Sequence, residues 1–300
     1  MPRDIITSEN SRQELDNSGQ FFWQPRSLSS DDKIFRVMQT NVSALNGKLI
    51  LVTGAARRVG RILALASARA GADVIVHYGN SKPEADETKK EIASLGRKAW
   101  TVQADLSQAD EVANLISQAN KIGALYALVN SAAVFEPLTM QETKLSDWER
   151  HLAINLTAPF LLSQAFAKQS TPSAPAAVPG GKDAALSSSS IVGRIVNILD
   201  WRALRPGADH FPYTISKAAL AAMTKSLAVS LAPNISVNGL ALGAILPPSD
   251  KPVSEDFLKS IPAGRWSKQE ELEDALIFLL TGPSYITGEI VHVDGGRHLV

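Results

Sequence analysis

The sequence predicts an α/β fold, and two observations carry this prediction. From about residue 45, apolar runs of strand length alternate with segments of helical period. The run at 49–53 then passes without a gap into a glycine-containing turn and a helix, which is how a βαβ unit opens. Such alternation over some 250 residues implies a single domain built on a Rossmann-type, doubly wound parallel sheet.

Each element is expected from its own periodicity and flanking turn residues. The expected strands are 49–53, 74–78, 99–103, 124–130, 194–199, 235–240 and 289–293. The expected helices are 60–70, 83–95, 110–120, 146–168, 213–231 and 268–280. Ligands of such sheets bind beyond the carboxyl ends of the strands, so the residues after each strand are the candidates for function.

Two stretches fall outside this pattern. Residues 1–42 lack a sustained period and are expected to form a flexible N-terminal arm, with the catalytic domain over 43–300. Residues 170–190 are rich in Ser, Pro, Ala and Gly, which offer no apolar face to bury. We expect a surface insertion there.

Composition excludes several classes of protein. Of 300 residues, 45% are apolar, which allows a sizeable core. Lys+Arg and Asp+Glu both total 30, so no global field favours nucleic acid or anionic membrane as a partner. No apolar run is long enough to cross a bilayer, and the absence of cysteine suits a reducing compartment. We expect a cytoplasmic protein that acts on a small molecule without a metal.

The turn after the first strand of the sheet is a candidate phosphate site. Gly54 and Gly60 allow a sharp turn and a close approach of backbone to ligand. The N–H groups at the start of the following helix, together with its dipole, favour a phosphate. The candidate contacts to a dinucleotide here are Gly54, Arg57, Arg58, Val59 and Gly60.

The residues after the second strand indicate which dinucleotide binds. An acidic residue there would bind the ribose 2′-OH of NAD and repel a 2′-phosphate. This chain has no carboxylate at that place, where the candidate contacts are His77, Tyr78, Asn80 and Ser81. Because Arg57 lies in the glycine loop and a guanidinium suits phosphate, we expect NADPH. An Arg57 that is merely solvated is the alternative for that residue.

Three further strand ends supply candidate cofactor contacts. Asp105 and Leu106 are placed to meet the adenine edge, although Asp105 would equally serve as a helix N-cap. The small residues Asn130, Ser131 and Ala132 lie where a nicotinamide ribose would bind, or they reflect tight packing. After the strand 235–240, the candidates are Gly243 and Ile245.

The candidate catalytic residues follow the fifth expected strand, 194–199. Tyr213 and Lys217 are four residues apart in an expected helix and therefore share one face. A neighbouring ammonium is expected to lower the pKa of the phenol from about 10, preparing it to exchange a proton near neutrality. Both residues are also candidate cofactor contacts.

These residues together resemble the short-chain dehydrogenase/reductase family over about 45–300. The chain is similar to its TGxxxGxG loop from Thr53 to Gly60, to its NNAG at Asn130-Ser131-Ala132, and to its YxxxK at Tyr213 and Lys217. Asp294-Gly295-Gly296 near the end is a further match. The resemblance implies that Asn155 holds a proton-relay water beside the lysine.

The chain departs from the family pattern at informative positions. Arg58 stands where the family has its middle loop glycine, and Ser131 replaces the second asparagine of NNAG. The family's catalytic serine lies thirteen residues before the tyrosine, which is Asp200 here. A ketone oxygen accepts hydrogen bonds, so a carboxylate would repel it, whereas a ring N–H or amino group is a suitable donor to Asp200.

The departures resemble the pteridine reductase branch, including dihydromonapterin reductases. Thr53-Gly54-Ala55-Ala56-Arg57-Arg58-Val59-Gly60 is similar to that branch's TGAAKRLG. The resemblance implies an Asp-Tyr-Lys site at Asp200, Tyr213 and Lys217. It also implies substrate contacts at Arg58, Phe135, Asp200 and Tyr213, with Phe135 stacked on the pterin. In contrast, the branch's substrate-contacting serine falls at Ala133 and its adenosine-phosphate arginine falls near Asn80.

The implied function is NADPH-dependent transfer of hydride to a C=N bond of a pteridine-like ring. The alternatives are a reductase of ketones, quinones or 3-oxoacyl groups, and a non-catalytic NADP(H)-binding sensor. Helices 146–168 and 213–231 carry more apolar positions than one sheet face covers. The resemblance implies that they pair across a twofold axis, which gives a homodimer or homotetramer.

Overall fold

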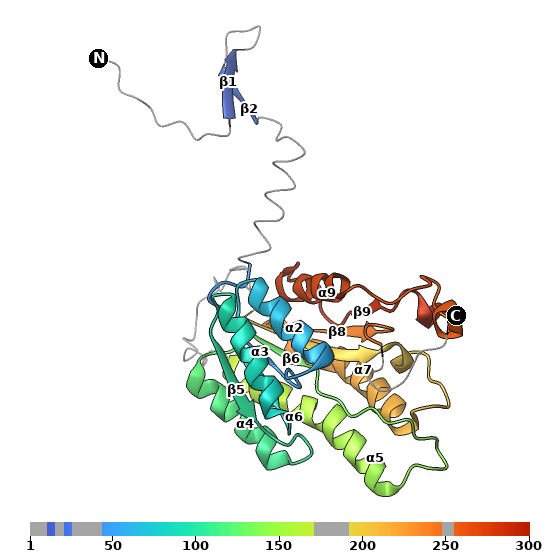
Figure 1. Cartoon of the computed structure of the whole chain (residues 1–300). Coiled ribbons are helices and arrows are strands. Elements are labelled where there is room, and N and C mark those ends of the chain that lie inside the picture. The colour runs from blue at the N-terminus through green and yellow to red at the C-terminus, as the bar shows by residue number, and fades with distance from the viewer. Residues whose placement is uncertain (1–10, 16–20, 26–43, 171–191, 248–254) are drawn as a thin grey trace, which may run out of the picture. The chain divides into compact units, whose positions relative to one another are not determined.

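The structure, a computed structural model, describes residues 11–15, 21–25, 44–170, 192–247 and 255–300 (Figure 1). The chain divides into two compact units, Met1–Ser43 and Ala44–Val300. The expected insertion at 170–190 lies outside the described residues apart from Ser170, the last residue of a helix.

The N-terminal unit contains a two-stranded antiparallel sheet. Strands β1 (Ser11–Leu15) and β2 (Phe21–Pro25) pair from Ser11 opposite Pro25 to Leu15 opposite Phe21. The sequence analysis expected no regular element here. Phe21, Phe22 and Trp23 are aromatic residues of the kind enriched in strands, a local signal that does not depend on a sustained period.

The second unit contains a seven-stranded parallel sheet, which confirms the predicted fold class. Its order is β5-β4-β3-β6-β7-β8-β9. The strand bounds are β3 (Leu49–Val52), β4 (Asp73–Tyr78), β5 (Ala99–Gln103), β6 (Ala127–Asn130), β7 (Gly193–Asp200), β8 (Ile235–Leu242) and β9 (Ile290–Val293). All six neighbouring pairs are parallel, so the carboxyl ends of the strands meet at one edge.

Every expected helix is present, with two differences. The helix bounds are α2 (Arg58–Arg69), α3 (Lys82–Ser94), α4 (Ala109–Ile122), α5 (Leu145–Leu152), α6 (Ala158–Ser170), α7 (Phe211–Leu231), α8 (Glu255–Lys259) and α9 (Gln269–Thr281). The single helix expected over 146–168 is interrupted by the π-helical turn Ala153–Thr157. The short helix α8 was not expected.

Helices cover both faces of the sheet, and each strand divides its side chains between them. On β3, Ile50 and Val52 join the core cluster formed with α2, α3 and α9, while Leu49 and Leu51 join the cluster formed with α4 and α6. Alternation of this kind follows from the two-residue period of a strand, and burial on both faces explains why the strands read as continuous apolar runs.

The strand order positions the site. The chain builds outward from β3 to β4 and β5, and then crosses back to place β6 on the other side of β3. Such a reversal leaves a crevice beyond the carboxyl ends of β3 and β6, where doubly wound sheets bind their ligands. Among the described helices, none is both long and apolar enough to span a membrane.

Candidate active site

The glycine loop lies tightly against the loop that follows β6. Gly54 has φ +64°, and a Cβ added there would lie 2.9 Å from the Cα of Ala132. A Cβ at Gly60 would lie 2.1 Å from the carbonyl oxygen of Gly54. The Thr53 hydroxyl accepts hydrogen bonds from the backbone N–H groups of Ser131 (2.9 Å) and Ala132 (3.0 Å). Glycine is therefore required at both positions by close backbone approach.

The start of α2 has the donors that a phosphate group requires. Arg57 is its N-cap residue and makes no side-chain capping hydrogen bond. The first N–H groups of a helix have no partner within the helix, so these remain available to a ligand. The glycine cradle and these donors fit the pyrophosphate of a dinucleotide.

Arg58, which stands where the family has a glycine, adopts the left-handed backbone conformation that glycine favours. Its φ is +50°, in the left-handed region. Its guanidinium Nη2 donates a hydrogen bond to the carbonyl oxygen of Pro247 at 3.0 Å. This bond joins the glycine loop to the segment after β8.

His77, a candidate cofactor contact, has both ring nitrogens within hydrogen-bond distance of the backbone. Its side chain is buried. Nδ1 accepts a hydrogen bond from the N–H of Gly54 at 3.1 Å, so the ring proton is on Nε2, which lies 3.1 Å from the carbonyl oxygen of Ala104. Burial lowers its pKa to about 4, against an opposing effect of the Ala104 bond, and the ring is neutral. His77 thus ties the glycine loop to the end of β5.

Accessible residues follow in the loop after β4. Tyr78, the last residue of β4, is buried, whereas Asn80 is exposed. Ser81 is the N-cap residue of α3 and makes no capping hydrogen bond with its side chain. Arg57 is exposed and lies 3.7 Å from a carboxylate oxygen of Glu84. Arg57, Asn80 and Ser81 are therefore the accessible groups at this corner.

The remaining candidates for cofactor contact lie at the same sheet edge. Asp105 is exposed, but it is not the N-cap of α4, which is Gln108; its carboxylate accepts the N–H of Ser107 at 2.9 Å. Asn130 donates to the side chain of Asn197 at 2.8 Å and is buried. The buried residues of this edge also include Leu106 and Ile245, while Val59 and Gly243 are half-buried.

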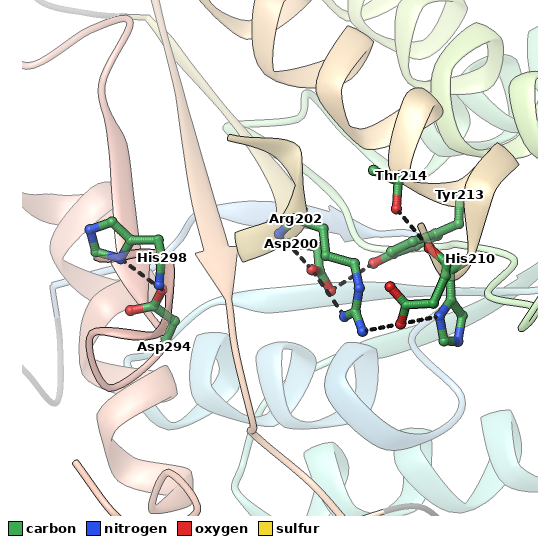
Figure 2. A network of polar contacts seen from close by, with 8 residues as sticks. Asp200, Arg202, His210, Tyr213, Thr214, Asp294 and His298 are labelled. Atoms are coloured by element: carbon green, nitrogen blue, oxygen red, sulfur yellow. Dashed lines mark hydrogen bonds and ion pairs between the residues drawn. The ribbon is translucent and has the colours of Figure 1, made fainter. Parts of the chain in front are cut away.

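Tyr213, Lys217 and Asp200 come together beyond β7, where Figure 2 shows the first and last of them. The Tyr213 hydroxyl donates a hydrogen bond to Oδ2 of Asp200 at 3.1 Å. Lys217 Nζ donates to the carbonyl oxygen of Ile198 at 2.7 Å and lies 5.8 Å from the centre of the Tyr213 ring. The strand end and one turn of α7 thus hold all three groups.

The expected lowering of the Tyr213 pKa is wrong. Burial raises it well above its usual value, and the charge of Asp200 and its hydrogen bond add to the increase, with Arg202 opposing them only in part. Burial also lowers the pKa of Lys217 to about 8, although Asp200 opposes this. Desolvation and the carboxylate of Asp200 outweigh the neighbouring ammonium, on which the expected lowering rested. Tyr213 therefore holds its proton firmly in this structure.

A polar network adjoins this group, and most of it was missed in the sequence (Figure 2). Arg202 Nη1 lies 3.6 Å from Oδ1 of Asp200, and its Nη2 donates to Asp209 at 2.8 Å. The hydrogen bond from Arg202 and the further bond from His210 lower the pKa of Asp209 to about 2, against an opposing effect of burial. Arg202 is only two residues from Asp200 in the sequence, whereas no local pattern indicated Asp209 and His210.

Phe135 forms an aromatic wall beside Tyr213. Its ring is stacked on His210 with centres 4.1 Å apart and meets Tyr213 edge-on at 4.7 Å. Phe135 is 53% exposed, so a face of apolar surface remains accessible to a ligand.

Asn155 lies in the π-helical turn and joins two neighbouring segments. Its amide exchanges hydrogen bonds with the backbone of Val134 at 2.9 and 3.0 Å, and donates to Ser216 Oγ at 3.0 Å. Such π-turns are frequent at functional sites. Among the described residues, the Asn155 side chain hydrogen-bonds with neither Tyr213 nor Lys217, so a part in a proton relay would pass through other groups.

Comparison with known families agrees with this geometry. A family model described as enoyl-(acyl carrier protein) reductase matches residues 54–298. The chain belongs to the short-chain dehydrogenase/reductase family. Among curated members of the family, it is 34% identical to a 3-oxoacyl-[acyl-carrier-protein] reductase of Synechocystis sp., over 85% of this chain and 98% of that protein. A 3-oxoacyl-[acyl-carrier-protein] reductase of Aquifex aeolicus is also 34% identical, over 84% of this chain and 98% of the relative.

Solved structures of the family are similar throughout the second unit. A FolM alternative dihydrofolate reductase 1 from Brucella canis, complexed with NADP, is 31% identical with a TM-score of 0.74, over 86% of this chain and 96% of that one. A blue fluorescent protein from a metagenomic library, in complex with NADPH, is 31% identical with a TM-score of 0.74, over 85% and 99%. Relatives of this reductase therefore include proteins named for two different substrates.

Replacing His77 tests its link to the glycine loop. We expect His77→Ala to lower the free energy of unfolding by about 2 kcal/mol or more, because the Gly54 N–H and the Ala104 carbonyl lose their buried partner. Denaturant unfolding would measure this, with the exposed Asn80→Ala expected within about 0.5 kcal/mol of wild type.

Comparison of the wild-type chain with His77→Ala at different pH values tests whether the buried ring is neutral. The wild-type chain should lose stability as pH falls from about 6.5 to about 4, since an unfolded histidine binds a proton there and His77 does not. His77→Ala should lack this part of the pH dependence. A variant as stable as wild type at neutral pH, with the same acid profile, would contradict the assignment.

Proposed function

We propose that this reductase transfers hydride from NADPH to a C=N bond of a pteridine-like ring. The observation that carries the proposal is Asp200, whose carboxylate accepts the hydroxyl of Tyr213 at 3.1 Å at the end of β7. A carboxylate at this place suits a substrate with ring N–H or amino donors and opposes a ketone oxygen. The similarity to the FolM alternative dihydrofolate reductase 1 supports this reading.

The residues of the glycine loop and of the loop after β4 support NADP(H) as the cofactor. The N–H groups at the start of α2 would bind the pyrophosphate, with Gly54 and Gly60 allowing its close approach. Arg57, Asn80 and Ser81 would surround the 2′-phosphate, since they are the accessible groups after β4. Relatives of known structure hold NADP or NADPH.

In the proposed reaction a bound nicotinamide supplies the hydride. Tyr213 gives its hydroxyl proton to the ring nitrogen, while Asp200 accepts a hydrogen bond from a neighbouring N–H of the ring. Lys217 is largely charged at neutral pH and lies near the Tyr213 ring, so it stabilises the phenolate that remains. Phe135 would stack on the flat ring of the substrate, and Arg58 would reach it from the glycine loop.

The second candidate is reduction of a 3-oxoacyl group or another carbonyl. The curated relatives, at 34% identity over nearly the whole catalytic unit, favour it. Asp200 opposes it, because its charge lies where a ketone oxygen would need a donor. A non-catalytic NADP(H) sensor is a third class, which the retention of Tyr213, Lys217 and Asn155 disfavours.

We also propose that copies of the chain associate through α6 and α7. Phe160 on α6 and Val229 on α7 are exposed apolar residues, 42% and 82% accessible. Light scattering at micromolar concentration should give the mass of a homodimer or homotetramer, and a monomer alone would contradict this.

The cofactor proposal predicts a measurable preference. NADPH should bind at least about tenfold tighter than NADH, since a charge-assisted hydrogen bond contributes about 1.5–3 kcal/mol. Asn80→Asp should reduce that ratio by placing a carboxylate beside the 2′-phosphate, whereas Asn120→Asp, on the exposed face of α4, should not. Calorimetry with both cofactors measures the ratio; equal affinities in the wild-type chain would refute the preference.

Asp200→Ser separates the two enzyme candidates. Turnover of dihydrobiopterin or dihydrofolate should fall by about one to two decades, because the variant loses a charged partner worth about 1.5–3 kcal/mol. Turnover of a 3-oxoacyl thioester should hold or rise, because a hydroxyl donor is restored. The steady-state ratio of the two activities is the readout.

A control is needed because Asp200 also accepts the N–H of Arg202 at 2.9 Å and so has a structural part. Asp209→Asn removes the other partner of Arg202 and leaves the Tyr213 contact in place, so it should change both activities alike. If Asp200→Ser impaired both substrates equally and lowered the melting temperature, Asp200 would not select the substrate.

The pKa of Lys217 predicts the pH dependence of the reaction. The reductive rate should fall as pH rises through about 8, because Lys217 then loses the charge that stabilises the phenolate. Ionisation of Tyr213 does not cause this decline, since its pKa is raised well above its usual value. Lys217→Arg keeps the positive charge and should move the decline to higher pH in initial-rate profiles. The same decline in the variant would assign it to another group.

A further inference from the structure

A cavity of about 600 Å³ lies beside the catalytic group. It is lined by Trp201, Arg205, Lys259, Ser260, Pro262, Arg297 and Val300. Trp201 directly follows Asp200 and belongs to the 3₁₀ turn Trp201–Ala203, whose N-cap is Asp200 itself. The residue next to the catalytic carboxylate in the sequence therefore forms part of the wall of this cavity.

The wall of the cavity is basic. Arg205, Lys259 and Arg297 contribute to it, and no aspartate or glutamate is among the described residues that do. Within the described part of the chain, neither Arg205 nor Arg297 forms an ion pair with a carboxylate; Arg205 donates to the carbonyl oxygen of Arg297 at 3.3 Å. Burial and the nearby positive charge of Arg202 lower the pKa of Arg297, against the opposing charges of Asp200, Asp209 and Asp294.

Arg297 is held in place before any ligand binds. Its guanidinium carbon lies 4.5 Å from the centre of the Trp201 ring and 4.6 Å from that of Phe257. Phe257 is in turn stacked on Trp266 with ring centres 5.3 Å apart. A guanidinium fixed between two aromatic rings presents its planar donors with little further loss of conformational freedom.

The Asp294-Gly295-Gly296 turn delivers Arg297 to this position. Gly295 and Gly296 have φ values of +63° and +84°, and a Cβ on Gly295 would lie 2.9 Å from side-chain atoms of both Ile261 and Ala263. The Asp294 carboxylate accepts the N–H groups of Gly296 and His298 at 3.0 and 2.9 Å, and Figure 2 shows its bond with the His298 ring. The Asp294-Gly295-Gly296 turn thus packs closely against the segment 261–263.

We propose that this cavity is a subsite for an anionic group, carboxylate or phosphate, carried by the substrate whose ring lies at Asp200 and Tyr213. The assignment of that ring rests on the proposed function, whereas the anion subsite rests on the cavity. Arginine forks match carboxylate and phosphate oxygens in pairs. The Trp201 ring and Pro262 supply apolar surface for the segment that joins the anionic group to the ring.

A matched set of pterins tests the subsite by kinetics with NADPH. Dihydrofolate carries carboxylates, dihydroneopterin monophosphate carries a phosphate, and dihydrobiopterin carries neither. The readout is the kcat/KM of each anionic pterin divided by the kcat/KM of dihydrobiopterin. For at least one anionic pterin, Arg205→Gln should lower this ratio by about tenfold, which corresponds to the loss of one charge-assisted hydrogen bond. Lys121→Gln, which removes a positive charge from the last turn of α4, should leave both ratios at wild-type values.

The member whose ratio falls identifies the anion. Lys259→Gln is a second variant for the same comparison, because Lys259 is exposed on the cavity wall and its replacement leaves the stacked Arg297 intact. Ratios within twofold of wild type in both variants, for both anionic pterins, would overturn the proposal.

Binding measurements separate failure of the subsite from failure of the proposed function. If no pterin is reduced, calorimetry of the NADP-bound full chain with p-aminobenzoylglutamate and with inorganic phosphate still judges the cavity. If the wild-type chain binds a probe, and Arg205→Gln binds it about tenfold more weakly while Lys121→Gln binds it equally well, the anion subsite is supported. The enzyme would then act on a substrate other than a pterin. Absence of binding of both probes, or equal affinity in wild type and Arg205→Gln, overturns it.

Discussion

The carboxylate of Asp200 is the interaction on which the site depends. One oxygen accepts the Tyr213 hydroxyl, and the other accepts the N–H of Arg202 and lies within ion-pair distance of its guanidinium. This one group therefore joins the end of β7, the 3₁₀ turn after it and the start of α7. Burial and the charge of Asp200 raise the pKa of Tyr213, so the phenol is protonated at neutral pH, as a proton donor must be before it reacts.

Close backbone packing is the matching constraint on the cofactor side. Gly54 contacts the loop after β6, Gly60 contacts Gly54, and the buried ring of His77 joins the loop to the end of β5. These contacts leave no space for side chains between the first turn of α2 and the sheet edge. The helix N–H groups are thus held at the crevice where the order of strands reverses. Arg58 keeps the left-handed backbone of a glycine and adds a bond to Pro247, which fastens the segment after β8 to the same loop.

The pKa of Tyr213 was expected to fall beside Lys217, and it rises instead. That expectation rested on a neighbour in the sequence, whereas desolvation, which depends on segments far apart in the chain, outweighs the ammonium. His77, a candidate cofactor contact, is enclosed by Gly54 and Ala104, which are also distant in the sequence. The interruption of the long helix at Ala153–Thr157 was also invisible locally, because its apolar period continues through the π-turn.

The sequence by itself determined the α/β class and the seven parallel strands of the sheet, because strand and helix periods are local. Resemblance to the family implied the grouping of Asp200 with Tyr213 and Lys217, and parallel strands bring their carboxyl ends to one edge whatever the details of packing. Only the tertiary structure decided the protonation states, the linkage of Asp200 to Arg202 and Asp209, and the basic cavity beside Trp201. Those properties arise from desolvation and from side chains that meet across long separations, such as Arg205 and Arg297, and no local pattern encodes such distances.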